Sequence, residues 1–163
     1  MKVSVIRHWE VDYKWSAWCT SDEFDRDSMG YNEAPIKHMS CSLPDKEYQK
    51  VYVSTLSRSR NTAIELFGNR LFHKTDLIDE VPLKSGFDTG KKLPLWFWNI
   101  SGRFQWFINS PRQTEGRFCT RKRAEQFVAI LCKEGGDCAV GLRDCSGYGL
   151  RHSCPYFEGP CSE

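Results

Sequence analysis

The sequence predicts an α/β fold, a three-layer sandwich with a mostly parallel central sheet. Short β-branched runs alternate along the chain with segments of helical periodicity, and this order is typical of parallel sheets covered by helices. The chain has 163 residues, of which 40% are hydrophobic. This size and composition are sufficient for one domain with a sizeable core.

The first half of the chain contains two predicted strands and one predicted helix. Residues 2–6 (KVSVI) and 50–54 (KVYVS) are β-branched runs that favour strands. Residues 9–35 are polar, aromatic and irregular, so we expect a long loop with a short helix. Directly after the second strand we expect a helix, with Ser57 as its N-terminal cap and Gly68 near its C-terminal end.

The second half continues the alternation. Residues 77–81 (LIDEV) predict a third short strand or extended segment. The aromatic stretch at residues 96–107 predicts a helix that packs most of its rings into a core, with one or two rings free to line a pocket. Apolar residues at helical spacing predict a helix from Thr120 to the glycine pair at 135–136, and residues 138–140 predict the next strand.

The charge balance restricts the classes of partner. The chain has 23 basic and 21 acidic residues, a net charge of +2. Sequence-independent binding of nucleic acid needs a basic surface, so we expect no nucleic-acid partner. A local basic pocket for a small anion remains compatible with this charge balance. The sequence has no apolar run long enough for a signal peptide or a membrane span. We therefore expect a cytoplasmic protein with no membrane contact.

The first candidate motif is Arg7-His8, directly after the first predicted strand. In open α/β sheets, ligands bind beyond the carboxyl ends of the strands. An imidazole nitrogen there can attack a phosphoryl group, and a neighbouring guanidinium can bind phosphate oxygens through its planar fork. Taken alone, the dipeptide is explained better as a surface histidine at a strand end.

The second candidate motif is the string STLSRSRNTA at residues 54–63, which spans a strand end, a tight turn and a helix start. Arg58 falls in the first turn of that helix, where backbone N–H groups and the helix dipole already favour an anion. A capped helix with solvated arginines would account for Ser57 and Arg60, but not for the whole string.

Together the two motifs resemble the histidine phosphatase (phosphoglycerate mutase-like) superfamily. That family has Arg-His-Gly after its first strand and, some tens of residues later, Ser-x-Leu-x-Arg-x-x-x-Thr-Ala at a strand-to-helix turn. Here VIRH at residues 5–8 precedes the string at residues 54–63. The resemblance implies a phosphoglycerate mutase-like fold, His8 as the phosphate-accepting nucleophile, and Arg7 and Arg58 as phosphate ligands.

The family also places an acidic residue after its next strand, as the general acid for the leaving oxygen. Glu80 lies where that residue is expected, and Asp79 is the alternative. Either carboxylate, taken alone, is explained almost as well as an exposed loop residue with no catalytic role. The resemblance therefore implies Glu80 as the acid, with Asp79 left open.

The chain departs from the family pattern at three places. One is that residues 9–36 lack the Thr and Asn that commonly follow the first motif, so one neutral phosphate contact has no assigned residue. Trp9 replaces the glycine after the nucleophile, which would narrow the pocket or force the loop onto a different path. The family also has a second histidine in a His-Gly step after the strand that here corresponds to residues 138–140. This chain continues with GLRD at residues 141–144, and His152 comes too late to take that role.

The resemblance divides the chain into a histidine phosphatase-like domain at residues 1–140 and an irregular, Cys-rich tail at residues 141–163. Five of the eight cysteines fall in the last 32 residues. The chain is then either a catalytically degenerate member of the family or one whose reading frame is altered after about Val140. The second explanation is favoured by the abrupt loss of periodicity. A zinc site is a third possibility, with the ligand candidates Cys138, Cys145, His152 and Cys154. The irregular spacing of these four favours an unstructured tail instead.

From these residues we expect a phosphatase that acts on phosphate monoesters through a phosphohistidine intermediate, impaired by the loss of the second histidine. The alternative is a catalytically inactive phosphate-binding or scaffold protein of the same fold. Neither a cofactor nor a metal is expected, because two arginines supply the positive field. The expected partner is a small phosphorylated substrate or phosphate, and the sequence does not determine an oligomeric state.

Overall fold

The structure is a computed structural model, and the chain in it forms two compact units. The residues that it describes are 2–38, 48–134, 138–141 and 156–160. The first unit comprises Met1–Val11, Ile36–Asp79 and Glu125–Glu163. The second comprises Asp12–Pro35 and Glu80–Ala124.

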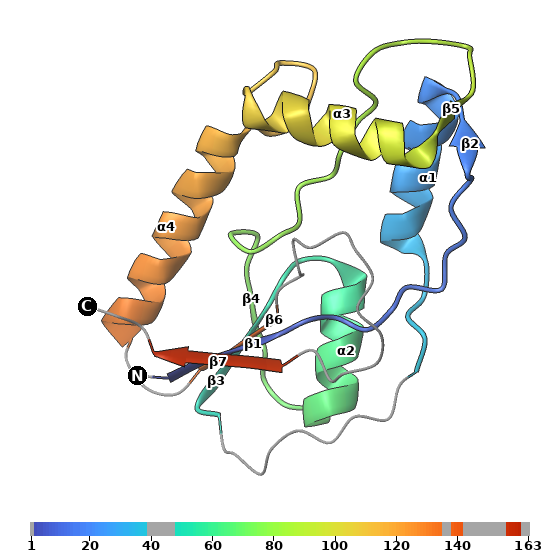
Figure 1. The fold of residues 1–163 in the computed structure, drawn as a ribbon. Coiled ribbons are helices and arrows are strands. Elements are labelled where there is room, and N and C mark those ends of the chain that lie inside the picture. The colour runs from blue at the N-terminus through green and yellow to red at the C-terminus, as the bar shows by residue number, and fades with distance from the viewer. Residues whose placement is uncertain (1, 39–47, 135–137, 142–155, 161–163) are drawn as a thin grey trace. The chain divides into compact units, whose positions relative to one another are not determined.

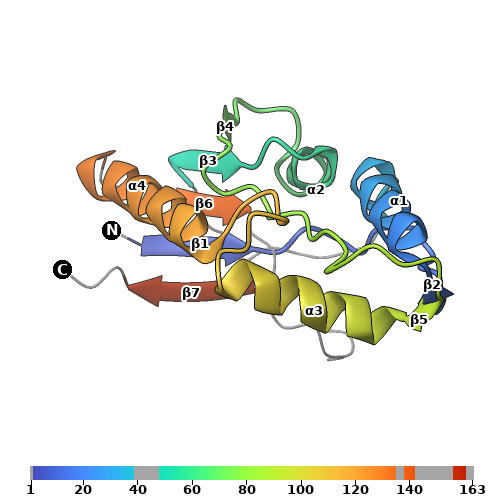
Figure 2. The ribbon, with the colours of Figure 1, turned by 90° about the horizontal axis from the view of Figure 1, so that it is seen from above.

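The first unit is built on a five-stranded sheet with the order β4-β3-β6-β1-β7. Its strands are β1 (Lys2–Ile6), β3 (Lys50–Val53), β4 (His73–Lys74), β6 (Cys138–Gly141) and β7 (Tyr156–Pro160). The pairs β1–β6, β3–β6 and β3–β4 are parallel, and only the pair β1–β7 is antiparallel. Figure 2 shows β3, β6, β1 and β7 side by side in this order. The predicted mostly parallel sheet is confirmed.

One face of the sheet is covered by α2 (Ser57–Phe67) (Figure 1). Val51 and Val53 alternate along β3 and pack with Ala63 of this helix in one buried cluster. The helix ends as predicted at Gly68, whose φ of 69° lies in the left-handed region that favours glycine.

The other face is covered by the C-terminal half of α4 (Arg117–Glu134). Tyr52 points to the face opposite its neighbours in β3 and packs with Phe127, Leu131 and Val140. The rings of Tyr52 and Phe127 meet edge to face with centroids 5.4 Å apart. Since the two faces of one sheet bind different helices, the predicted three-layer arrangement is confirmed.

The second unit has a largely aromatic core. Its elements are β2 (Trp18–Cys19), α1 (Ser21–Glu33), β5 (Leu93–Pro94), α3 (Leu95–Phe107) and the start of α4. Phe24 of α1 stacks on Trp98 of α3 with ring centroids 5.9 Å apart, and both side chains are buried. The Trp98 indole N–H donates to the Cys19 carbonyl at 3.0 Å, which satisfies the one polar group of this ring. This core therefore forms within the second unit.

Three predicted elements differ from the structure. Residues 77–81 were predicted to be a short strand or an extended segment. They form no strand, because this segment contains a turn that the Asp79 N–H closes on the Asp76 carbonyl at 3.0 Å. Ile78 is nevertheless buried, so its apolar character reflects core packing rather than strand pairing. We expected a short helix within residues 9–35, and the helix that lies there, α1, is 13 residues long. The helix predicted from Thr120 begins earlier, at Arg117.

The aromatic helix α3 is confirmed, but the prediction that most of its rings are buried is wrong. Trp98 and Gly102 are its buried residues. Trp96, Phe104 and Phe107 are exposed. The helix is therefore apolar on its outer face as well as on the face in the core.

Of the predicted tail, the structure describes Gly141 and β7 (Tyr156–Pro160), which pairs with β1. The candidate zinc ligands Cys145, His152 and Cys154 lie outside the described residues, so the prediction for the tail and its boundary at residue 140 stay predictions. None of the helices in the described parts of the chain has both the length and the apolar character needed to cross a membrane.

An ion pair joins the end of α4 to β3. Lys50 Nζ lies 2.8 Å from Glu134 Oε2, and the Tyr52 hydroxyl also donates to this carboxylate. The Lys50 ammonium, then the Tyr52 hydroxyl, holds the pKa of Glu134 below its ordinary value of 4.5. A carboxyl group whose pKa is lowered in the folded state stabilises the fold at pH values above its ordinary pKa. This contribution is lost as the pH falls through the lowered pKa.

We therefore expect Glu134→Gln to be less stable than the wild type at pH 7 and about equally stable well below the ordinary carboxyl pKa. Urea unfolding of both proteins at neutral and acidic pH measures this difference. A gap between the two proteins that did not change with pH would contradict the assigned ion pair.

Candidate active site

His8 lies in the first unit, directly after the carboxyl end of β1. Its side chain is buried, and Nδ1 is 2.6 Å from the carbonyl oxygen of Trp9. Because a carbonyl oxygen only accepts hydrogen bonds, Nδ1 must carry a proton in this contact. In the neutral imidazole the lone pair is then on Nε2, and this is the nitrogen that can act as a nucleophile.

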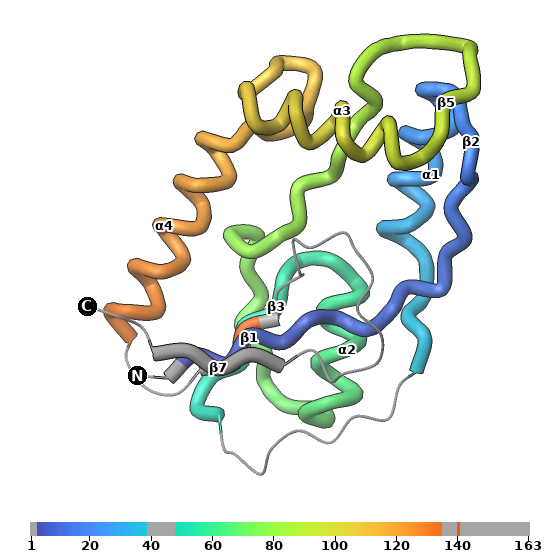
Figure 3. Tube along the Cα trace, viewed as in Figure 1, coloured from blue at the N-terminus to red at the C-terminus, as the bar shows by residue number. Residues whose placement is uncertain are grey.

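The backbone after His8 is hydrogen-bonded to α2. The Trp9 N–H donates to Thr62 Oγ1 at 3.1 Å, and the Thr62 hydroxyl donates to the Arg58 carbonyl at 2.8 Å. Figure 3 shows the chain leaving β1 and crossing α2. Thr62 therefore connects the histidine loop with the helix turn that carries Arg58. Thr62 belongs to the predicted motif at residues 54–63, but the sequence pattern indicated no role for it.

The Trp9 side chain is buried, with 6% of its surface exposed. The ring that replaces the family's glycine is thus accommodated within the protein interior. Its backbone still provides both contacts described above, the carbonyl to His8 and the N–H to Thr62.

Arg58 is the second residue of α2 and is 2% exposed. The prediction that Ser57 caps this helix is wrong, because Leu56 is the capping residue and its side chain makes no cap hydrogen bond. The turn is held instead by Ser54, whose Oγ accepts from the Leu56 N–H at 3.3 Å and donates to Ser59 Oγ at 2.9 Å. A guanidinium keeps its proton in proteins, so its burial in the first turn of a helix concentrates positive charge there.

Asp79, the alternative general acid, makes a specific contact with the same turn. One carboxylate oxygen accepts from the Thr55 N–H at 2.6 Å, and the other accepts from the Thr55 hydroxyl. Both oxygens are thereby used to hold the segment that leads from β3 into α2. This geometry favours a positioning role for Asp79 over proton transfer.

We expect Thr55→Val to lower the free energy of unfolding by about 1 kcal/mol, because it removes the hydroxyl and leaves one carboxylate oxygen without that donor. Thr55→Ser keeps the hydroxyl and should restore most of the stability. Urea unfolding of the three proteins measures both effects. Equal stability of the valine and serine variants would contradict the importance of the side-chain contact.

The two remaining predicted residues lie at different places. Arg7 is exposed and directly precedes His8. Glu80 is half-buried, lies outside the helices and strands, and is the first residue of its segment in the second unit. The structure thus brings Arg7, His8 and Arg58 into one unit, and Glu80 belongs to the other.

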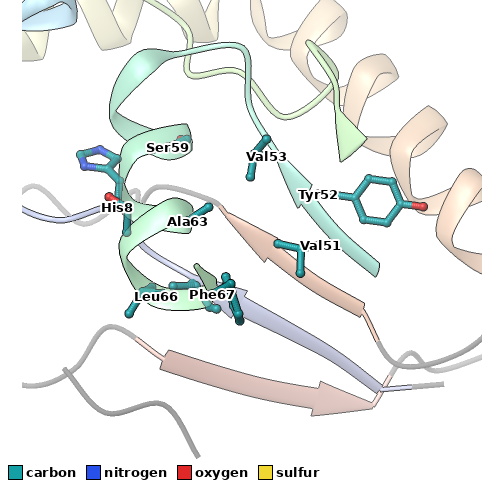
Figure 4. A pocket seen from close by; sticks show the side chains of 10 residues that line it. His8, Val51, Tyr52, Val53, Ser59, Ala63, Leu66 and Phe67 are labelled. Atoms are coloured by element: carbon teal, nitrogen blue, oxygen red, sulfur yellow. The ribbon is translucent and has the colours of Figure 1, made fainter. Parts of the chain in front are cut away.

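A small cavity lies beside His8 between α2 and the sheet. Its volume is about 20 Å³, and its polar lining residues include His8, Ser59 and Thr62. Figure 4 shows Val51 and Val53 on the β3 face that lines it, while Tyr52 points the other way. This volume suffices for about one water molecule and not for a phosphate ester. The cavity is therefore packing space behind the histidine and not a substrate site.

Among the described residues, no group of three or more His, Cys, Asp or Glu side chains is placed to hold a metal ion. In the described part of the chain, Cys19 and Cys119 have free thiols. The strand predicted before the family's second histidine is β6 (Cys138–Gly141). The residues that follow it lie outside the described ranges, and the sequence there reads LRD.

Comparison with solved structures identifies the fold of the chain. No protein-family model matches the chain, and no curated protein matches it. Solved structures with the phosphoglycerate mutase-like fold match it, and several of them are described as phosphatases. The resemblance predicted from the two sequence motifs is therefore confirmed at the level of the fold.

Three of these structures illustrate the similarity. A protein proposed to be an alpha-ribazole-5'-P phosphatase from Escherichia coli has 17% identity and a TM-score of 0.53, over 88% of this chain and 74% of that one. A mycobacterial glucosyl-3-phosphoglycerate phosphatase has 13% identity and a TM-score of 0.50, over 87% and 75%. A histidine-to-alanine variant of a phosphoserine phosphatase from Entamoeba histolytica, in complex with phosphoserine, has 15% identity and a TM-score of 0.50, over 87% and 73%.

Proposed function

We propose that the protein is a phosphatase that hydrolyses small phosphate monoesters through a phosphohistidine intermediate on His8. The observation that carries this proposal is the hydrogen bond from His8 Nδ1 to the Trp9 carbonyl, because it leaves the lone pair on Nε2. The fold supports it, since two of the three proteins named above are described as phosphatases and the third is proposed to be one.

In the proposed first step, His8 Nε2 forms a bond to phosphorus and the bond between phosphorus and the ester oxygen breaks. Glu80 gives its proton to the leaving oxygen, so that an alcohol departs. Arg7 and Arg58 hold the equatorial oxygens, where the charge of the transition state is concentrated. The cation at Arg58 is rigidly placed because the Ser54, Thr55 and Thr62 contacts fix its turn.

In the second step, a water molecule attacks the phosphohistidine and gives its proton to the Glu80 carboxylate. The bond between nitrogen and phosphorus breaks, inorganic phosphate leaves, and the lone pair returns to Nε2. The cycle consumes one water per ester. It requires no metal, because the two guanidinium groups provide the positive charge.

A second candidate function is a phosphate-binding or scaffold protein that turns over little substrate. The observation that favours it is the sequence at residues 141–144, where GLRD stands in place of the expected His-Gly step. Such a protein would keep Arg7, His8 and Arg58 as an anion site without the second imidazole at the phosphoryl group.

The experiment that separates the two functions uses p-nitrophenyl phosphate as substrate and inorganic phosphate as ligand. We expect the wild-type protein to release p-nitrophenol with multiple turnovers in the presence of EDTA, and phosphate to inhibit competitively. Calorimetric binding of phosphate without turnover would support the binding protein instead. Neither turnover nor phosphate binding would contradict both functions.

A further inference from the structure

The helix α3 carries an apolar stripe on the side opposite its buried face. The stripe consists of Trp96, Ile100, Phe104 and Phe107. Their spacing of four, four and three residues places them on one side of a helix. Trp98 and Gly102, the buried residues of α3, come from the opposite side. A helix that is apolar on both sides is typical of one that is covered on both.

The stripe continues around the corner into α4. Ile108 follows α3 directly, and the Phe118 N–H in the first turn of α4 donates to Asn109 Oδ1 at 2.9 Å. The Trp106 indole N–H donates to Thr120 Oγ1 at 3.0 Å, which fixes the start of α4 against α3. We call the four stripe residues together with Ile108 and Phe118 the docking face. Its side chains are between 54% and 73% exposed.

The docking face is large for a surface without a partner. Four of its six side chains are aromatic, and at more than half exposure these four alone present on the order of 500 Å² of apolar surface. This approaches the roughly 800 Å² that each partner contributes to a standard protein–protein interface. Contiguous apolar patches of this size commonly mark interaction sites.

The charge around the docking face is strongly positive. Leu95–Ala124 contains six Arg or Lys residues and one Glu, a net charge of +5. Arg112 and Arg123 are paired with Asp88 and Glu115 at 3.1 and 2.8 Å. Arg103, Arg117, Arg121 and Lys122 are exposed basic side chains of the same segment. The Arg117 guanidinium lies 4.7 Å from the centroid of the Phe107 ring, at the edge of the docking face.

The charge and the shape of the docking face indicate which kind of partner binds it. A second copy of this chain would bring two segments of charge +5 together, and like charges across an interface are costly. Helices that lie in a membrane interface have a strongly charged face of their own, whereas α3 has Arg103 as its single charged residue. A ridge of residues at i and i+4 fits the groove of another helix.

We propose that the docking face binds an acidic amphipathic helix of another protein. The apolar side of that helix covers the α3 stripe, and its Asp or Glu residues meet Arg117, Arg121 and Lys122 at the corner. This interaction is independent of the phosphatase proposal, because none of its residues takes part in the chemistry proposed at His8.

The test uses a fluorescein-labelled helical peptide of about 18 residues, with leucines at helical spacing on one side and glutamates on the others. Its counterpart has lysine in place of every glutamate. By fluorescence anisotropy we expect the acidic peptide to bind the full chain at least tenfold more tightly than the basic peptide, and more weakly as salt is raised. Phe104→Ser and the double change Arg121→Glu with Lys122→Glu should each weaken binding at least tenfold. The matched control is Val128→Ser, an exposed apolar residue of α4 outside the docking face.

Four results would overturn the proposal. They are equal binding of both peptides, binding unaffected by Phe104→Ser, anionic phosphatidylglycerol vesicles bound in place of the peptide, or a dimer in sedimentation that Phe104→Ser dissociates. Phe104, Arg121 and Lys122 are exposed, so these variants should keep the wild-type melting temperature, which circular dichroism verifies.

Discussion

His8→Ala is expected to lower kcat/KM for p-nitrophenyl phosphate by at least ~10³-fold, because the variant lacks the atom that accepts the phosphoryl group. Steady-state kinetics on the purified variant measures this. His8 is buried and bonded to the Trp9 carbonyl, so thermal unfolding of the same sample must show that the variant is folded.

The matched control for this variant is His38→Ala. His38 lies in the same unit, but its side chain is 85% exposed and its partner is Glu65. This variant should keep the wild-type kcat/KM. A folded His8→Ala protein that retained more than about a tenth of the wild-type activity would remove His8 from the mechanism.

Arg58→Gln has the second largest expected effect. Removing one preorganised positive group from a phosphoryl-transfer site costs about 10²–10³-fold in rate, so we expect kcat/KM to fall by this factor. The inhibition constant of inorganic phosphate should rise in the same variant, because the ground-state anion loses the same partner. Initial rates at varied substrate and phosphate concentrations measure both quantities.

Arg60→Gln is the control for this change, since Arg60 is exposed and lies two residues further along α2. It removes the same charge from the same helix, but not from the protein interior. Equal kinetic effects of the two substitutions would show that Arg58 acts only through the general field of the helix. Arg58→Lys should not restore full activity, because an ammonium lacks the planar fork.

The sequence alone predicted the strands and helices in which an apolar run is bounded by turn residues. β1, β3, α2 and β6 lie where the alternating strand and helix periods predicted them. The predicted strand at residues 77–81 failed because Ile78 meets the core from a turn, and burial alone does not distinguish a turn from a strand. The helix α3 was predicted, but its aromatic composition concealed that the rings divide between a buried and an exposed side.

The candidate site was predictable only at the level of residue types. The motifs identified His8 and Arg58, because an imidazole after a strand and a guanidinium at a helix start suit phosphate chemistry. The contacts that fix them join residues far apart in sequence, 53 positions between Trp9 and Thr62 and 24 between Thr55 and Asp79. Such contacts follow from the tertiary structure, and no local pattern predicts them.

The most direct test of the account is to trap the phosphorylated protein. Wild-type protein is mixed with excess p-nitrophenyl phosphate, quenched rapidly in alkali, where phosphohistidine is stable, and examined by intact mass spectrometry and peptide mapping. The account predicts a single added phosphoryl group on His8 that is lost in acid and absent from His8→Ala. A wild-type protein that hydrolyses the ester while its phosphoryl group lies on another residue would contradict the assignment of His8 as the nucleophile.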